Sequence, residues 1–149
     1  MISKILVPTD GSETAKKSVK YSAELAKQLG ATITLLSVID ISVILAQPIS
    51  AIASPAHLRE SVEDYMRQAA DASIQEATKI CQENGIQPET VIRSGHPVDE
   101  IINEAVKSKV DLIVMGSQGR SALKAAFLGS VTFGVIHKDT KFPVLVLRK

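Results

Sequence analysis

Residues 114–136, VMGSQGRSALKAAFLGSVTFGVI, combine the features that decide the fold of this chain. An apolar run typical of a buried strand ends at Gly116, and a second glycine follows at Gly119. Glycine lets a backbone turn sharply after a strand and come close to another group. A third glycine, Gly129, precedes Ser130 and a second apolar run with helical character. The stretch therefore predicts a strand, a glycine-lined turn and a helix, in that order.

The start of this last helix is suited to binding an anion. The first backbone N–H groups of a helix have no partner within the helix, and such an end attracts phosphate. For any one glycine taken alone, a plain structural role, in a turn or before a helix, is the favoured explanation. The whole spaced set after a strand favours nucleotide binding, because glycine turns can hold a polyphosphate from two sides. Arg120, with its planar guanidinium, or Lys124 could reach a terminal phosphate, and both are equally well explained as solvated loop charges.

Composition narrows the function classes. The 149 residues suffice for one domain, 1–149, with a substantial core, and 45% of them are apolar. A net charge of +1 gives no strong electrostatic attraction for nucleic acid. An aromatic content of 3% gives no surface on which bases could stack. No apolar run approaches the roughly 20 residues that span a bilayer. A lone cysteine, Cys81, and the absence of a visible leader predict a cytoplasmic protein.

Short apolar runs alternate with helix-like segments along the chain. We expect strands at 5–7, 32–39, 89–93, 110–115 and 143–147, and helices at 13–29, at 58–84, from 97 onward and at 130–137. Residues 41–57 lack a clear period and are predicted to form a long loop. The alternation predicts an α/β fold, a Rossmann-like open five-stranded and mostly parallel sheet with helices on both faces. Ligands of such sheets bind outside the carboxyl ends of the strands.

Two residues are open to alternative interpretations. Asp10 follows the first predicted strand, where its carboxylate either accepts hydrogen bonds from a ribose or caps the next helix together with Glu13. Ser130 either binds phosphate or caps its own helix. The distal glycine pattern favours the ribose for Asp10, and the adjacent Gly129 favours phosphate for Ser130 because it allows close backbone approach.

Several catalytic patterns are absent from the sequence. It has no Walker-type loop, no G-x-G-x-x-G after the first strand and no G-x-S-x-G around a serine. His57, His96 and His137 have no metal-ligand spacing to one another or to Cys81, so we expect no metal-ligating side chains. No residue stands out as a strong general base, and we assign no catalytic residue.

Three patches of the chain resemble the ATP-binding branch of the universal stress protein family. They are the opening KILVPTDGSETAKKSVKYSAELA, the segment Ser37–Asp40, and the run from Gly116 to Val131 together with the terminal FPVLVLRK. The resemblance covers nearly the whole chain except residues 41–57. It implies an adenine nucleotide alpha-hydrolase-like fold. The glycine pattern is its specific part, because members that do not bind ATP lack it.

The resemblance also implies a set of ATP contacts. Asp10 would bind the ribose, and Mg²⁺ or Mn²⁺ would sit on the phosphate oxygens. The remaining contacts would be Pro8 and Thr9 on the adenine side, the Val38 backbone on adenine, Met115 and Gly116 against the ribose, and Gly119, Gly129, Ser130, Val131 and Thr132 on the phosphates. One family variant has His at position 118, where this chain has Gln118, so the resemblance gives no support for hydrolysis there.

The family commonly dimerises through its final strand, here Val144 to Leu147, and an apolar edge strand favours such pairing independently. We therefore expect an ATP-binding, homodimeric regulatory module of the stress response with an unidentified protein partner. Two alternatives stay open. One is a slow ATPase or an enzyme that transfers phosphate or adenylate, and the other is a nucleotide-free dimeric scaffold.

Overall fold

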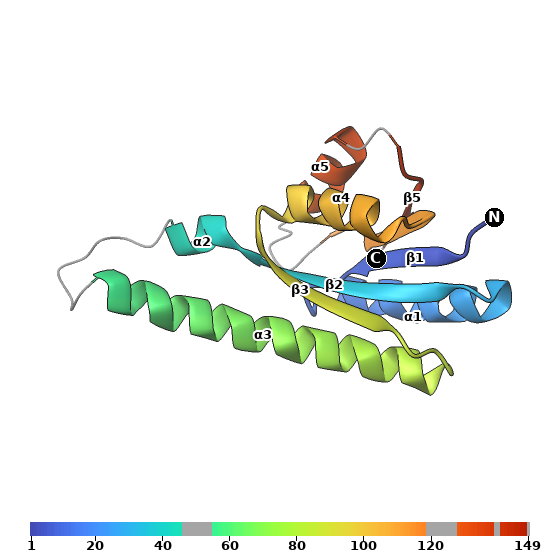
Figure 1. Cartoon of the computed structure of the whole chain (residues 1–149), viewed down its shortest axis with the longest axis horizontal. Helices are drawn as coiled ribbons and strands as arrows, with labels where there is room; N and C mark the ends of the chain where they lie inside the picture. Colours follow the sequence, from blue (N-terminus) through green and yellow to red (C-terminus); the bar gives the residue numbers. More distant parts are fainter. Residues whose placement is uncertain (46–54, 119–127, 139–140, 149) are drawn as a thin grey trace.

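The computed structural model describes residues 1–45, 55–118, 128–138 and 141–148. Its centre is a five-stranded sheet with the strand order β3-β2-β1-β4-β5 (Figure 1). Every neighbouring pair in this sheet is parallel. The strands are β1 (Lys4–Pro8), β2 (Thr32–Asp40), β3 (Glu89–Gly95), β4 (Leu112–Gly116) and β5 (Val144–Leu147). The predicted open parallel α/β sheet is confirmed.

Helices cover both faces of the sheet. Helices α1 (Glu13–Leu29) and α3 (Pro55–Glu83) lie on one face, and α4 (Pro97–Ser108) and α5 (Ser130–Lys138) lie on the other (Figure 1). Along β1, Ile5 and Val7 pack toward α1 and α3, whereas Leu6 packs toward α4 and α5. Side chains alternate between the faces of a strand, so covering both faces buries all three residues. This burial on both faces is why the strands are continuous apolar runs in the sequence.

The predicted loop at 41–57 is wrong at both ends. Helix α2 (Ile41–Leu45) follows β2 directly, and α3 already begins at Pro55. The Asp40 carboxylate starts α2 by accepting hydrogen bonds from the Ser42 backbone N–H at 2.9 Å and from its hydroxyl at 2.6 Å. Proline suits a first helical position because its φ is already helical and it has no N–H to satisfy. A five-residue helix is too short to show a period in the sequence. Residues 46–54 lie outside the described ranges.

An ion pair fastens α4 to the edge of the sheet. Glu104 on α4 is only 3% exposed, and one of its oxygens accepts two hydrogen bonds from Arg93 on β3, at 2.9 and 3.0 Å. The Ser108 hydroxyl donates to its other oxygen. Burial would raise the pKa of Glu104, but the hydrogen bonds from Ser108 and Arg93 and the charge of Arg93 lower it below its ordinary value.

We expect Glu104→Gln to lower the free energy of unfolding by about 1–3 kcal/mol at pH 7, because the hydrogen bonds to a charged acceptor are lost. The lowered pKa makes the contribution of Glu104 complete above its unfolded pKa, near 4.5, and lost as the pH falls through the folded value. Urea unfolding from pH 7 to pH 3 should therefore show the two proteins converging in acid. Glu60→Gln, at an exposed position of α3, is the control. A difference that is independent of pH would contradict this account.

Candidate functional site

The carboxyl ends of β1 and β4 form the topological switch point of the sheet. These strands are neighbours, yet β2 lies beyond β1 on one side and β5 lies beyond β4 on the other. The helix that follows β1, α1, and the helix that follows β4, α5, cover opposite faces. A crevice at such a point is the usual ligand site of an open α/β sheet. The turns after β1 and β4 therefore belong to one candidate site.

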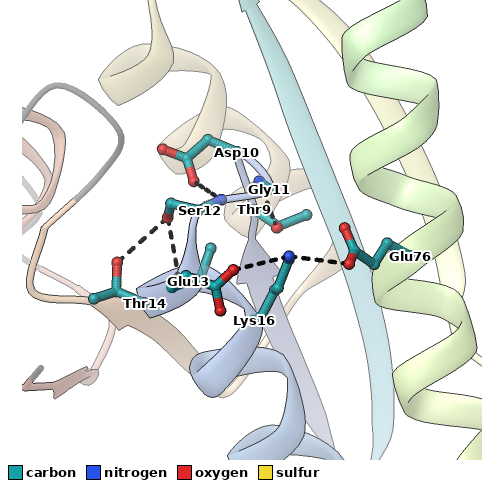
Figure 2. Close-up of polar contacts among 9 residues, drawn as sticks. Thr9, Asp10, Gly11, Ser12, Glu13, Thr14, Lys16 and Glu76 are labelled. Atoms are coloured by element: carbon teal, nitrogen blue, oxygen red, sulfur yellow. Dashed lines mark hydrogen bonds and ion pairs between the residues drawn. The ribbon is translucent and has the colours of Figure 1, made fainter.

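The turn after β1 is held by short local hydrogen bonds (Figure 2). The Thr9 backbone N–H extends the pairing with β2 by donating to Leu36 O at 2.8 Å, and Thr9 is 6% exposed. Gly11 has a φ of 78°, in the left-handed region that glycine adopts without strain. The exposed Asp10 carboxylate accepts from the Ser12 N–H at 2.9 Å. Asp10 thus lies at the rim of the switch point, in a turn with a fixed backbone.

The capping interpretation of Asp10 is wrong. The N-cap of α1 is Ser12, whose hydroxyl accepts from the Ala15 N–H at 3.2 Å. Gly11, with its left-handed φ, lies between Asp10 and Ser12, so Asp10 precedes the N-cap residue by two positions. Glu13 does not complete a capping box with Asp10; it pairs with Lys16 at 3.1 Å, and Lys16 also reaches Glu76 of α3 at 3.0 Å (Figure 2).

The segment 116–118 leaves β4 in close contact with α1. A Cβ added to Gly116 would lie 3.1 Å from the Thr14 Cβ and 3.2 Å from both its carbonyl carbon and its carbonyl oxygen. A side chain at position 116 would require α1 to move by a few tenths of an ångström, so Gly116 serves the packing of this helix as well as a turn. The Thr14 hydroxyl donates to the carbonyl oxygen of Gln118. Ser117 and Gln118 are 9% and 5% exposed.

Two further elements hold this segment from the other side. The Thr132 hydroxyl of α5 donates to Gly116 O at 2.8 Å. The Gly129 N–H donates to Ser117 O at 2.6 Å, and the Ser117 N–H donates to Leu147 O at the end of β5 at 2.7 Å. The loop that was predicted to hold phosphate thus begins from a backbone fixed by α1, α5 and β5.

The amino end of α5 lies beside this segment. Gly129 precedes the helix and its carbonyl accepts from the Phe133 N–H at 2.9 Å, which is the bond of a cap position. Ser130 is the first helical residue, so its capping interpretation is wrong. Ser130 is exposed, Val131 half-buried and Thr132 buried. The Thr132 hydroxyl already donates to Gly116 O. The predicted phosphate contact of Thr132 would therefore be made by the backbone N–H of Thr132.

The other predicted contacts lie in three settings. Pro8 and Val38 are half-buried near the carboxyl ends of β1 and β2. Met115 is 4% exposed and packs in the core on the α4 and α5 face, which leaves little of its side chain for a ligand. Gly119 and Arg120, with Lys124, lie outside the described residues. In the described part of the chain, no group of three or more His, Cys, Asp or Glu side chains could hold a metal ion.

Sequence reasoning missed Thr14 as a component of this site. Thr14, Ser18 and Ser22 recur every fourth residue of α1 and are all buried. Four-residue spacing places them on one helix face. A polar stripe on a buried face was the available signal, because buried hydroxyls need partners. The partner of Thr14 is 104 residues away in the sequence.

A family profile described as "Universal stress protein family" matches residues 1–148. The chain belongs to the universal stress protein family. Universal stress protein YxiE of Bacillus subtilis is 34% identical to this universal stress protein over 149 residues, covering 99% of this chain and 100% of that one. Universal stress protein MJ0577 of Methanocaldococcus jannaschii is 36% identical over 157 residues, covering 100% and 96%.

Solved structures agree with this assignment. The structure of hypothetical protein MJ0577 has a TM-score of 0.86 at 32% identity, covering 100% of this chain and 97% of that chain. A universal stress protein in complex with cAMP has a TM-score of 0.72 at 25% identity, covering 99% and 97%. In this universal stress protein, none of the helices within the described ranges is long and apolar enough to cross a membrane.

We expect Gly116→Ala to lower the free energy of unfolding by about 1–3 kcal/mol, because the added methyl group meets the backbone of α1 and forces a shift. Urea unfolding measures the loss. Amide chemical shifts should move at Thr14 and at residues 116–118 and stay unchanged in β3, at the far edge of the sheet. Unchanged stability with unmoved Thr14 would mean that α1 does not constrain position 116.

Proposed function

We propose that this protein binds ATP at the carboxyl ends of β1 and β4 and acts as a nucleotide-dependent regulatory module in the stress response. One observation carries the proposal. The Asp10 turn, the segment 116–118 and the amino end of α5 meet at the switch point of the sheet. A carboxylate can accept hydrogen bonds from ribose hydroxyls, and a helix amino end attracts phosphate. The two together suit a ribose joined to phosphate.

Each predicted residue has a role in this proposal. Asp10 accepts hydrogen bonds from the ribose, and Arg120 approaches the terminal phosphate. The base lies beside Pro8, Thr9 and the Val38 backbone, and the ribose lies against Met115 and Gly116. The phosphates meet Gly119, Gly129, Ser130, Val131 and Thr132, largely through backbone N–H groups, although the N–H of Gly129 itself is bonded to Ser117 O. The exposed amino end of α5 suits phosphate oxygens. Mg²⁺ or Mn²⁺ would supply charge neutralisation on those oxygens when bound.

The complex of a relative with cAMP supports an adenine nucleotide as the ligand class. The spaced glycines favour a polyphosphate over a cyclic monophosphate, because glycine turns on two sides could hold a phosphate chain. The enzymatic alternative has weaker support. Gln118, which could orient a phosphate or a water, is 5% exposed, and its carbonyl is bonded to Thr14.

We further propose that the protein is a cytoplasmic homodimer paired through β5. This strand is the last in the sheet order, and its four residues, VLVL, are all half-buried. An apolar edge strand has unpaired backbone groups on its outer side, and a second copy of the same strand satisfies them. We also propose that the dimer acts on an unidentified protein partner.

The first test identifies nucleotide retained by freshly purified protein after denaturation, using chromatography and mass. We expect ATP at nearly one per chain, because a site that binds without a general base hydrolyses slowly. Mostly ADP or AMP would favour the enzymatic alternative, and cAMP would indicate a cyclic-nucleotide sensor. No nucleotide, and no binding of added Mg-ATP, would leave the dimeric scaffold as the better account.

Asp10→Ala tests the ribose contact. We expect roughly a tenfold or greater loss of ATP affinity, the equivalent of one or two charge-assisted hydrogen bonds. Affinity for 2′,3′-dideoxy-ATP should change much less, because that analogue lacks the ribose hydroxyls. Calorimetric titration of both ligands against both proteins gives the comparison. An equal loss for the two ligands would show that Asp10 acts through the turn and not through the ribose.

A further inference from the structure

Thr14 joins the turn after β1 to the turn after β4. It lies in the first turn of α1, is 7% exposed and donates its hydroxyl proton to the carbonyl of Gln118. Its hydroxyl also lies 3.3 Å from that of Ser12, whose N–H donates to Asp10 (Figure 2). A chain of polar contacts therefore runs from Asp10 through α1 to the segment that follows β4.

The packing at Gly116 is a second, independent observation. The absence of a Cβ at this position lets the Thr14 backbone come close, with a hypothetical Cβ only 3.2 Å from the Thr14 carbonyl oxygen. The same region of close approach between β4 and α1 contains the hydrogen bond from the Thr14 hydroxyl to Gln118 O. Steric fit and hydrogen bonding thus act on the same three residues, 116–118.

Thr132 performs the matching function from the opposite face. Its hydroxyl donates to Gly116 O at 2.8 Å, and Gly129, just before α5, donates its N–H to Ser117 O at 2.6 Å. The segment 116–118 is consequently fixed between the amino ends of two helices. A change on the α1 side should be felt at Gly129.

We propose that Thr14 is a positioning residue for the nucleotide site: its bond to Gln118 sets the phosphate side of the site relative to Asp10. This inference rests on the proposed function, because it assigns the phosphates to the amino end of α5. The physical effect is preorganisation. A binding loop that is already ordered avoids the entropy cost of ordering when the ligand arrives. Thr14 itself need not touch the nucleotide.

The test compares three variants by calorimetric titration with Mg-ATP. Thr14→Val keeps the shape and removes the hydroxyl, and we expect it to bind ATP about 5–20-fold more weakly than the original protein. Thr14→Ser restores the hydroxyl and should bind within about twofold of the original. Ser18→Ala is the matched control, since Ser18 is buried one turn later and its hydroxyl donates to the Thr14 carbonyl within the same helix. Should Thr14→Val fail to fold, Thr14→Ala takes its place.

Hydrogen exchange separates this proposal from the proposed function. In the nucleotide-free protein, Thr14→Val should speed exchange of the Ser117 and Gly129 amides about 5–10-fold and leave β3 amides unchanged. If the original protein binds no adenine nucleotide, the proposed function fails and the exchange result still decides the role of Thr14. ATP affinity unchanged in Thr14→Val, an equal loss in Ser18→Ala, or unchanged exchange at both amides would each overturn the proposal.

Discussion

The close approach of α1 to the end of β4 is the constraint on which the site depends. The absence of a Cβ at position 116 lets Thr14 pack closely there, and the Thr14 hydroxyl donates to the Gln118 carbonyl. The contact joins chain segments that are 104 residues apart, at the point where the strand order reverses. Because β1 and β4 are already paired in the sheet, this contact adds a direct link between the turns that follow them.

The opposite face has its own set of constraints on α5. Gly134 of α5 lies so close to α4 that an added Cβ would be 2.6 Å from a methyl carbon of Val98. Lys138 forms an ion pair with Asp99 on the same pair of helices. Helix α4 is in turn anchored to β3 through the buried Glu104. Helix α5 is therefore held from two sides, by α4 and the sheet edge and, at its amino end, by the bonds of Gly129 and Thr132 to the segment that α1 contacts.

Most of the fold follows from local sequence signals, and the parts that do not have identifiable reasons. Apolar runs predict the strands. The carboxyl ends of parallel strands lie at one edge of the sheet, so the sequence also predicts that Asp10 and Gly116 lie at that edge. Helix α2 was not predicted, because its start depends on the side chain of Asp40 and because its five residues are too few to show a helical period. The cap of α1 falls at Ser12 because Gly11 adopts a left-handed φ, which the sequence permits without requiring. The polar stripe of α1 indicates buried hydroxyls, but the partner of Thr14 could not be inferred, because it is a backbone carbonyl that any residue at 118 would present.

The spaced glycines have more than one physical origin. Gly116 is explained by packing against α1 without any ligand, and Gly129 supplies both a donor to Ser117 and an acceptor for the first bond of α5. Packing and ligand binding are nevertheless not competing explanations. The same contacts hold the amino end of α5 beside the segment 116–118, and a preformed array of donors is what a phosphate chain needs. A glycine pattern can thus indicate a nucleotide site even where each glycine first serves the fold.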